Sequence, residues 1–528
     1  MKKILTLVLA LCMLSSYAFA EDLIENIDVD PGFPVVKEPI SVTIALVPQD
    51  AAVDFQVDQN WMTEYINRNS GLDIEWMVID STAASERIPL MLNSGDMPDA
   101  ILGRGFQAND VAQYGMSEGM FYPVNELLDY MPIFSAFLEE NPEVREGITT
   151  TDGNIYGFPA LNNIYSYAAR FFIDQTWLDR LGLENPTTLE EFKNMLIAFR
   201  DEDANGNGDP NDEIPVSFTD FGGVYTLLQH MGIMGDANAT STNSYTMDKN
   251  GVATFMPVTE EFKQGVIWLR ELFAEGIIDQ EAFTMDDTMR MAKQQNPEIP
   301  IVGMIYSWTP DADVPNFHEQ YEVLPPVLAP DGNRYAAGMT STSRNEFAIT
   351  VFCEYPEVAA RWADQFYTPE ASIQNFWGPI ADGCIQKNDD GTYTLLEPPE
   401  GVSADDHAWD MSTRDFGPKY IPEGFSDKII LPASTSDAQK LELAKVAEEY
   451  AVPPYPTVLH TSEELDEMTM LATDIISYVE TTGARWVYEG GIEEEWDDYV
   501  AQLNQMGLER LMEIRQAALD RYYGKAAE

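Results

Sequence analysis

The stretch from Asp201 to Glu213 carries oxygen-bearing side chains at alternate positions, with glycines between them. Side chains of this kind at this spacing are the ligands of an EF-hand-like calcium loop, in which a glycine permits the sharp turn. One register starts at Asp201 and continues through Asp203, Asn205, Gly206 in the turn, Asp209 and Asp212. The other starts at Asp203 and continues through Asn205, Asn207, Gly208 in the turn, and Asp212 with Glu213.

The alternative to a metal site here is an acidic, asparagine- and glycine-rich turn that binds no ion. The agreement of ligand type with spacing favours calcium. Because calcium is plentiful outside cells, we expect a structural ion rather than a sensing one.

Aromatic side chains that stand among turn-forming and polar residues form a second candidate site. Most of the 10 tryptophans, 24 tyrosines and 25 phenylalanines are expected in the core. Ring faces at a cleft suit the C–H faces of sugars, while carboxylates and amides bind the hydroxyl groups. The candidate ligand contacts are Phe106, Tyr165, Tyr306, Trp308, Trp377 and Trp409.

Motifs that would indicate catalysis lack their context. Gly115-Met-Ser117-Glu-Gly119 has the spacing of a hydrolase nucleophile elbow, but a helical pattern precedes it and an extended one follows. The glycines at 103 and 105 resemble a dinucleotide fingerprint but follow the third strand rather than the first. The four histidines have no metal-ligand spacing. We therefore expect no catalytic residues, although 89 acidic residues leave a glycosidase carboxylate pair open as an alternative.

The elements that must position these residues alternate between strand and helix. Alternating apolar residues predict strands at 41–47, 73–79 and 99–102, with helices between them. This order is typical of an α/β domain with a parallel sheet, in which ligands bind beyond the carboxyl ends of strands. The loop 103–106 is therefore a candidate ligand contact. A capping box at 187–191 begins a helix that leads into the calcium loop, and two helical stretches, about 461–481 and 493–523, end the chain.

The first 20 residues have the order of a secretory signal peptide. A basic start is followed by an apolar run from Ile4 to Leu14 and an Ala-x-Ala site that ends at Ala20. Leu11 precedes Cys12, where a lipidation signal needs a small residue. We therefore expect cleavage after Ala20 and a periplasmic or extracellular protein without direct membrane insertion.

Two further expectations concern the exported chain. Residues 21–40 are acidic, contain three prolines and lack periodicity, which predicts a flexible leader. Cys353 and Cys384 remain after cleavage, either as a disulfide or as two separate buried thiols.

The charge of the chain excludes several partners. With 30 Lys+Arg against 89 Asp+Glu, the formal net charge is −59. Such a chain is repelled by nucleic-acid phosphates and by anionic membrane surfaces.

Four segments resemble the extracellular solute-binding proteins of family 1, the sugar-binding receptors of ABC importers. Within that family the resemblance is to the subgroup of alginate-oligosaccharide receptors and many lipoproteins. The segments are Glu86–Ala100, Asp152–Pro159, Trp177–Thr188 running into the calcium loop, and Trp486–Gly490 with Trp496–Tyr499 and Leu519–Tyr522. The similarity covers most of residues 41–523.

The resemblance implies the two-lobed α/β fold of type II periplasmic binding proteins. Each lobe would hold a mainly parallel sheet flanked by helices, and crossover strands would join the lobes. The expected division is 1–20 signal peptide, 21–40 leader, 41–165 lobe 1, 166–340 lobe 2 with the calcium loop, 341–435 lobe 1 again, and 436–528 C-terminal helices mainly of lobe 2.

The resemblance also implies a function. A non-catalytic, monomeric receptor would capture an oligosaccharide between its lobes and deliver it to an ABC permease. A structural Ca²⁺ would be bound by the side chains of Asp203, Asn205, Asn207, Asp212 and Glu213 and by the carbonyl of Asp209. A secreted glycoside hydrolase, or a peptide or amino-acid receptor of the same architecture, are the alternatives.

Overall fold

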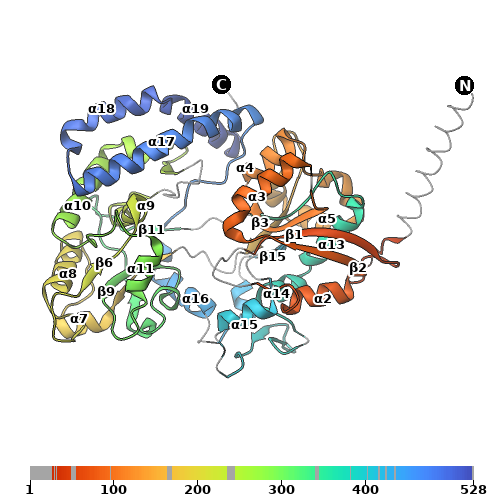
Figure 1. Cartoon of the computed structure of the whole chain (residues 1–528), viewed down its shortest axis with the longest axis horizontal. Helices are drawn as coiled ribbons and strands as arrows, with labels where there is room; N and C mark the ends of the chain where they lie inside the picture. Colours follow the sequence, from red (N-terminus) through yellow and green to blue (C-terminus); the bar gives the residue numbers. More distant parts are fainter. Residues whose placement is uncertain are drawn as a thin grey trace, which may run out of the picture. The chain divides into compact units, whose positions relative to one another are not determined.

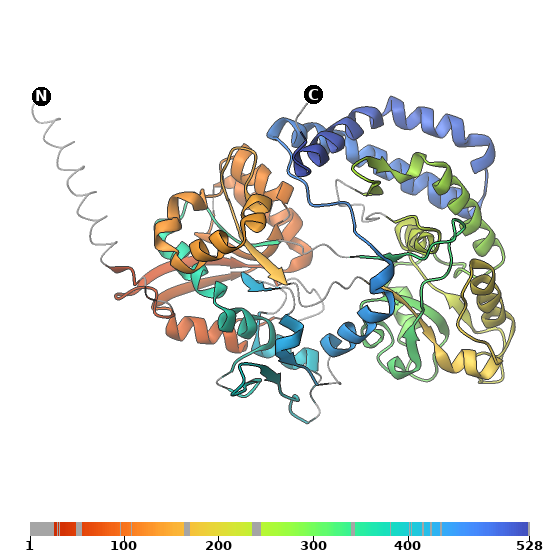
Figure 2. The same ribbon diagram turned by 180° about the vertical axis from the view of Figure 1, so that it is seen from behind.

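The computed structural model describes residues 26–525 except 29, 31, 49–54, 96, 107, 163–168, 235–243, 339–343, 381, 401, 403, 414–416, 423–424 and 433–435. The chain forms two compact units. Unit 1 comprises residues 1–164, 342–432 and 459–462, and unit 2 comprises 165–341, 433–458 and 463–528 (Figures 1 and 2). The boundaries expected from the sequence, after 165, 340 and 435, lie close to these positions. The short return at 459–462 was not expected.

Unit 1 is built on a six-stranded sheet in the order β15-β4-β12-β3-β1-β2. Strand β1 runs parallel to β2 and β3, while β12 runs antiparallel to β3 and β4. A small sheet of β13, β14 and β16 is appended. The strands are β1 (Ile40–Leu46), β2 (Leu72–Val78), β3 (Ala100–Phe106), β4 (Phe158–Asn162), β12 (Arg344–Ile349), β13 (Ile385–Lys387), β14 (Tyr393–Leu395), β15 (Lys419–Ile421) and β16 (Ile429–Ile430). The helices are α2 (Trp61–Asn69), α3 (Ser81–Ser94), α4 (Ala108–Val111), η1 (Ala112–Ser117), η2 (Val124–Tyr130), α5 (Pro132–Glu140), α6 (Pro142–Ile148), α13 (Pro356–Asp364), η6 (Gln365–Tyr367), α14 (Pro369–Trp377), α15 (Ala404–Met411) and η7 (Phe425–Lys428).

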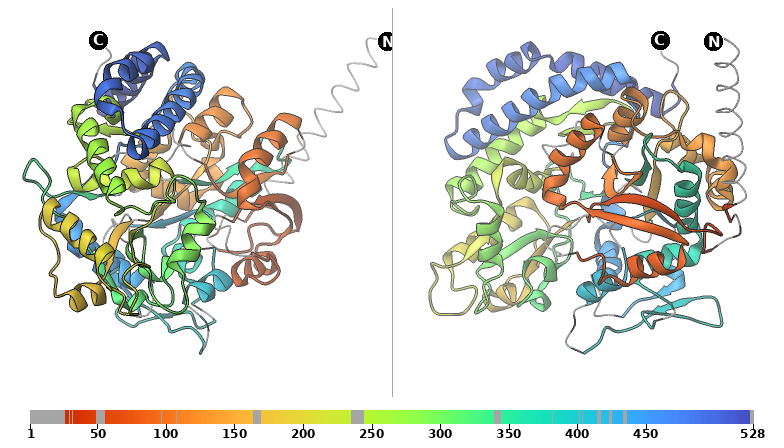
Figure 3. Two further views of the ribbon diagram at one scale, coloured as in Figure 1. Left: turned by 60° about the vertical axis from the view of Figure 1, so that its left-hand side comes forward. Right: turned by 45° about the vertical axis from the view of Figure 1, so that its right-hand side comes forward.

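Both faces of this sheet are covered, as alternation along the strands requires. Ile44 and Leu46 of β1 pack into one apolar cluster with α2, α5 and α13. Ala45 between them points to the opposite face and packs into a second cluster with Ile88 and Leu92 of α3. Figure 3 shows strands β1 to β3 of this sheet running side by side, with α2 and α3 beside them.

The segment expected as a flexible leader is packed onto unit 1 from Asn26 onward. Val35 and Val36 are buried, and Ile27 pairs with Val36 in an antiparallel bridge. The buried guanidinium of Arg361 donates from Nε to the carbonyl oxygen of Asp28 at 2.7 Å. These apolar and backbone contacts come from residues distant in sequence, so composition did not reveal them.

Unit 2 contains a four-stranded sheet in the order β10-β5-β9-β6. Strand β6 runs parallel to β9, whereas β5 runs antiparallel to both of its neighbours. A mainly parallel sheet was expected here, but two of the three strand pairs are antiparallel, because β5 runs against both of its neighbours. The strands are β5 (Arg170–Asp174), β6 (Ile214–Val216), β7 (Thr246–Asp248), β8 (Ala253–Phe255), β9 (Val302–Ser307), β10 (Tyr321–Val323), β11 (Ala336–Ala337) and β17 (Ala451–Val452).

Helices form the larger part of unit 2, and α17, α18 and α19 lie beside α10 (Figures 1 and 3). Leu269 of α10 and Ile475 of α17 belong to the same apolar core, and both are fully buried. The helices are α7 (Gln175–Leu181), α8 (Leu189–Asp201), α9 (Asp220–Tyr225), η3 (Thr226–Met231), η4 (Met256–Val258), α10 (Glu260–Ala274), α11 (Asp287–Gln294), α12 (Pro310–Asp313), η5 (His318–Gln320), α16 (Ser436–Ala447), η8 (Glu448–Tyr450), α17 (Ser462–Tyr488), α18 (Ile492–Gln505) and α19 (Leu508–Tyr522).

Candidate functional site

A cavity of about 960 Å³ lies within unit 2, at the carboxyl ends of β6 and β9. Because these strands are parallel neighbours, the segments that follow them meet at one edge of the sheet, where ligands of α/β proteins bind. The volume is that of a small-molecule ligand site. The lining comprises Asp220, Phe221, Gly222, Gly223, Tyr225, Thr226, Gln229, Ile233, Met234, Ala282, Phe283, Met285, Tyr306, Ala337, Gly338, Val452, Pro454, Glu480, Thr481, Ala484 and Tyr488.

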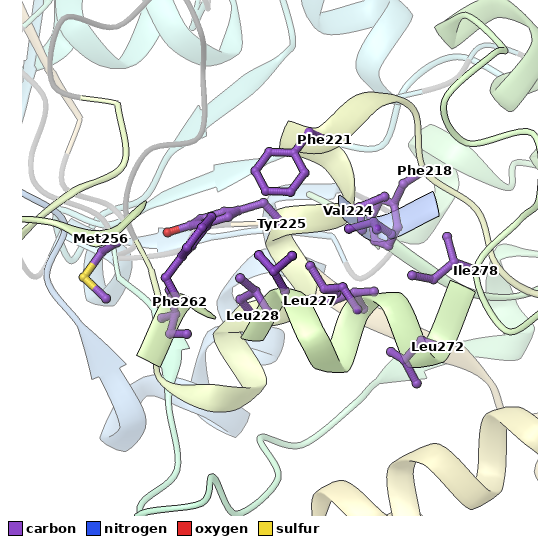
Figure 4. Packing of buried hydrophobic residues seen from close by; sticks show 14 of the residues in the cluster. Phe218, Phe221, Val224, Tyr225, Leu227, Leu228, Met256, Phe262, Leu272 and Ile278 are labelled. Atoms are coloured by element: carbon purple, nitrogen blue, oxygen red, sulfur yellow. The ribbon is translucent and has the colours of Figure 1, made fainter. Parts of the chain in front are cut away.

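Helix α9, which carries the lining residues from Asp220 to Tyr225, is held in place by its apolar side chains. Figure 4 shows Phe221, Val224 and Tyr225 of α9 packed with Leu228 and Phe262. Tyr225 also donates from its hydroxyl to the carbonyl of Met234 at 3.1 Å. The rings of α9 are therefore part of the core and fix the cavity wall in place.

Tyr306 and Gln229 form the polar wall of the cavity. Gln229 Nε2 donates to the Tyr306 hydroxyl oxygen at 3.0 Å, and the Tyr306 ring lies 4.8 Å from Phe171, centroid to centroid. Burial raises the pKa of Tyr306, so its hydroxyl stays protonated at neutral pH. The ring has a face that suits a sugar, and the hydroxyl, whose oxygen accepts from Gln229, keeps its hydrogen for donation.

Two of the described residues that line the cavity are charged, and both are acidic, Asp220 and Glu480. The backbone of Asp220 has φ +50°, and its Oδ1 accepts from the Gly223 amide at 2.9 Å. Oε1 of Glu480 accepts from the Tyr245 hydroxyl at 3.3 Å. Burial raises the pKa of Glu480, and the negative charge of Asp220 adds to the rise. Two carboxylates at one cavity are acceptors suited to the hydroxyl groups of a carbohydrate.

Two of the six aromatic residues singled out in the sequence have an accessible ring. Tyr306 lines the cavity, and Trp308, just beyond β9, is 47% exposed. Phe106 is buried against Tyr114 and Phe121 in unit 1. Trp377 and Trp409 are also buried in unit 1, so the structure explains these three rings as core. Tyr165 lies outside the described residues.

Sequence reasoning missed Asp220, Gln229 and Glu480. Asp220 follows β6 closely, and a polar residue just beyond a strand is a signal that could have found it. Glu480 lies within a long surface helix, one of many acids there. Nothing in its neighbourhood along the chain marks it.

The calcium-loop residues Asp203, Asn205, Asn207, Asp209, Asp212 and Glu213 are drawn into one turn. Asp203 Oδ2 accepts from the Gly208 amide at 3.0 Å, and Asn205 Nδ2 donates to Asp212 Oδ1 at 3.1 Å. Asn207 Nδ2 donates to Asp212 Oδ2 at 2.6 Å. Gly206 and Gly208 have positive φ, +80° and +93°, as the bends require.

The contacts of the Asp201 side chain distinguish the two possible registers of the calcium loop. Its carboxylate forms an exposed two-pronged ion pair with Arg200, at 2.7 and 2.8 Å, on the end of α8. Asp203 Oδ1 and Glu213 Oε2 are buried and have no hydrogen-bond partner. The geometry therefore favours the register that starts at Asp203.

The residues of the loop fit a calcium ion. The two buried oxygens without partners are carboxylate oxygens, and oxygen is the ligand atom that calcium prefers. Burial, reinforced by Asp212 and Asp203, raises the pKa of Glu213, as expected for a carboxylate without a nearby cation. Within the described residues no three His, Cys, Asp or Glu side chains stand close enough to hold a metal by themselves. The asparagine amides and the Asp209 carbonyl would have to complete the set.

Ser117 of the G-x-S-x-G motif and the two cysteines have structural surroundings that explain them without catalysis. Ser117 ends the helical turn η1, and its hydroxyl contacts that of Ser462 at 2.5 Å, so the strand-to-helix elbow of a hydrolase is absent around this serine. Cys353 and Cys384 are separate, buried, free thiols. Burial raises the pKa of Cys353 to about 12 and that of Cys384 to about 11, which leaves both protonated.

Comparison with known proteins decides the family. No family model matches the chain. The fructooligosaccharide ABC transporter substrate-binding protein FusA of Streptococcus pneumoniae serotype 4 is 31% identical over 488 residues, which cover 88% of this chain and 87% of FusA. This chain belongs to the substrate-binding proteins of ABC transporters. The family predicted from the sequence segments is confirmed.

Solved structures of substrate-binding proteins agree with this assignment. An EF-hand mutant of S. pneumoniae FusA in complex with fructo-nystose has a TM-score of 0.78 and 28% identity, and covers 92% of this chain and 100% of that one. An HMO-binding, ABC-transporter-associated solute-binding protein of Bifidobacterium longum infantis has a TM-score of 0.79 and 25% identity, and covers 93% and 100%. The predicted two-lobed α/β fold is thereby confirmed.

Substrate-binding proteins of ABC transporters act outside the cytoplasm, so the expected extracytoplasmic location is confirmed at that level. Among the described residues, no helix has the length and apolar character needed to cross a membrane. The relatives are binding proteins rather than enzymes.

Proposed function

We propose that this substrate-binding protein captures an oligosaccharide in the unit 2 cavity and delivers it, unaltered, to the permease subunits of an ABC transporter. The observation that carries the proposal is the cavity itself: aromatic rings, the Tyr306–Gln229 hydrogen bond and two carboxylates line about 960 Å³ at the carboxyl ends of β6 and β9. Rings and hydrogen-bonding groups arranged in this way suit the two faces of a sugar. FusA and the B. longum protein are named for oligosaccharide ligands, which supports the same class here.

Tyr306 and Trp308 are the aromatic residues that we assign to the sugar. Tyr306 lines the cavity, and Trp308 offers an exposed ring shortly after it in the chain. Asp220, Gln229 and Glu480 join them as the hydrogen-bonding groups.

A structural calcium ion in the loop 203–213 is part of the proposal. Asp203, Asn205, Asn207, Asp212 and Glu213 would bind it through side-chain oxygens, and Asp209 through its carbonyl. The ion would supply the positive charge that the buried oxygens of Asp203 and Glu213 lack and would tie the end of α8 to β6. The existence of an EF-hand in FusA, whose EF-hand mutant has been solved, supports this assignment.

We also propose that the protein is exported by its first 20 residues, is cleaved after Ala20, and works as a monomer in the periplasm or outside the cell. This segment lies outside the described residues, and its charge and apolar pattern carry the proposal. N-terminal sequencing of the exported protein would begin at Glu21 if the cleavage site is right.

A thermal-shift panel tests the proposed ligand class. The mature protein with calcium is mixed with 1-kestose, nystose, lacto-N-tetraose and a set of di- to pentapeptides. We expect at least one oligosaccharide to raise Tm and chromatography to recover it intact. Stabilisation by peptides alone would indicate the peptide receptor, and release of shorter sugars would indicate the glycoside hydrolase.

A further inference from the structure

Among the described residues that line the unit 2 cavity, the charged ones are all acidic. Its lining includes the carboxylates of Asp220 and Glu480, and none of the described lining residues is lysine or arginine. Proteins similar to this chain are named for different sugars. One solved structure at 23% identity is named an alginate-binding protein, while FusA is named for fructooligosaccharides. The charge of the cavity therefore bears on which kind of sugar this protein accepts.

The two acids are held in place at the cavity. Asp220 has a positive φ, +50°, which is uncommon for a residue other than glycine, and its Oδ1 is fixed by the Gly223 amide. Glu480 is fixed by the Tyr245 hydroxyl. Neither acid forms an ion pair with a described residue. After burial, the negative charges of Glu480 and Asp220 both raise the pKa of Tyr245, so the two acids act on the same group.

Arg170 is a buried cation that influences Tyr306, but its side chain does not line the cavity. Arg170 Nη1 donates to the carbonyl oxygen of Ala337 at 2.7 Å, and the Arg170 side chain is buried. It lies close enough to favour the ionised form of Tyr306, but it does not line the cavity. A ligand in the cavity thus meets the two carboxylates first.

We propose that Asp220 and Glu480 make the unit 2 cavity selective for uncharged sugars and exclude sugars that carry a carboxylate, such as uronates and sialylated oligosaccharides. This inference rests on the proposed function and specifies its substrate class. A carboxylate brought into the cavity would face two like charges in a site of reduced dielectric, which opposes binding. The hydroxyls of an uncharged sugar would instead donate hydrogen bonds to the same two groups.

Matched ligand pairs test this selectivity. One pair is 1-kestose and its oxidised derivative, in which primary hydroxyls have become carboxylates; the other is lacto-N-tetraose and its sialylated form. Isothermal titration of the mature, calcium-loaded protein should give a Kd for the carboxylated member that is on the order of 100-fold weaker than for its neutral partner. Tighter or equal binding of the carboxylated member would overturn the inference.

Variants assign the effect to the two acids. Glu480→Gln and Asp220→Asn remove charge at nearly constant size, and asparagine both keeps the acceptor for Gly223 and tolerates positive φ. Each should reduce the carboxylated-to-neutral Kd ratio about 10-fold. Glu489→Gln, an exposed site just past α17 and outside the cavity, removes the same charge and should leave the ratio unchanged.

The outcomes separate the two proposals. If the wild-type protein binds no neutral sugar of the panel, the proposed function fails. If it binds neutral sugars but the carboxylated-to-neutral Kd ratio is close to one, the function stands and the charge selectivity is refuted. The same conclusion follows if this ratio is equal in Glu480→Gln, Asp220→Asn and Glu489→Gln.

Discussion

The hydroxyl of Tyr306 accepts a hydrogen bond from Gln229 Nε2 at 3.0 Å, and both residues line the unit 2 cavity. This contact joins the end of β9 to the 3-10 helix that follows α9. It fixes the orientation of the ring and leaves the hydroxyl hydrogen for a ligand. The site is therefore organised before a sugar arrives, which lowers the entropic cost of binding.

A double-mutant cycle tests this coupling. Tyr306→Phe and Gln229→Leu should each weaken sugar binding about 2- to 10-fold, the usual effect of losing one hydrogen bond. Because both changes break the same contact, the double variant should be weaker by less than the product of the single effects. If the loss of affinity in the double variant equals the product of the two single losses, the two groups act independently. Titration calorimetry with the neutral sugar that stabilises most strongly supplies the four Kd values.

Buried His230 should make unit 2 sensitive to acid. Its ring lies 4.6 Å from that of Phe171 and 4.5 Å from that of Phe192, and burial lowers its pKa to about 3. The ordinary pKa in the unfolded chain is about 6.5. Between these values the unfolded state binds the proton and the folded state does not. Stability is therefore intact above pH 6.5 and falls by about 1.4 kcal/mol for each pH unit below it.

Urea unfolding at pH 7.5, 6.5, 5.5 and 4.5 measures the effect. His230→Phe keeps an aromatic ring between the two phenylalanines and removes the titrating group. Below pH 6.5 the free energy of unfolding should fall less in the variant than in the wild type. Above pH 7 the two plots of unfolding free energy against pH should run parallel. Equal slopes below pH 6.5 would contradict a neutral buried His230.

The negative charge of Glu480 should destabilise the folded, sugar-free protein at neutral pH. Burial raises its pKa in the folded protein, so the folded state disfavours the ionised form. The stability that protonation contributes is present below the unfolded pKa and is lost as pH rises through the folded pKa. Glu480→Gln should therefore raise the Tm of the sugar-free protein at pH 7 and have little effect near pH 4. A lower Tm at pH 7 would show that the charge is stabilising in the folded protein.

Calcium removal should destabilise unit 2. Chelator should lower Tm on the order of 5 °C, because the ion stabilises the state that binds it. Replacing Asp203 and Asn205 by alanine should abolish the chelator effect. Asp201→Asn is the matched control, since Asp201 pairs with Arg200 and lies outside the favoured register. If Asp201→Asn abolishes the effect as well, the loop uses the other register; if chelator leaves the wild type unchanged, the loop is only a turn.

Features formed by consecutive residues could be predicted from the sequence. The residues proposed to bind calcium lie within one turn, so their spacing alone suggested the site. The strands 41–47 and 73–79 carry their own apolar alternation and were found in place as β1 and β2. The family resemblance depends on local segments in the same way.

The aromatic contacts could not be predicted, because tertiary packing decides which way a ring faces. Phe106 is the last residue of β3 and Tyr306 the last but one of β9. Phe106 nevertheless packs against Tyr114 and Phe121, while Tyr306 lines the cavity. Glu480 comes to the cavity from α17, far along the chain from α9. No periodicity distinguishes that acid from its exposed neighbours on the same helix.

The central claim is that the unit 2 cavity binds the sugar, and a titration of wild type and Tyr306→Ala side by side tests it most directly. The truncation removes the ring and its hydroxyl from the cavity wall. Using calcium-loaded protein and the neutral oligosaccharide with the largest thermal shift, we predict one binding site in the wild type and an affinity at least ~100-fold weaker in the variant. The thermal transition of the sugar-free variant verifies that it is folded. An unchanged affinity in a folded Tyr306→Ala protein would contradict the assignment of this cavity as the sugar site.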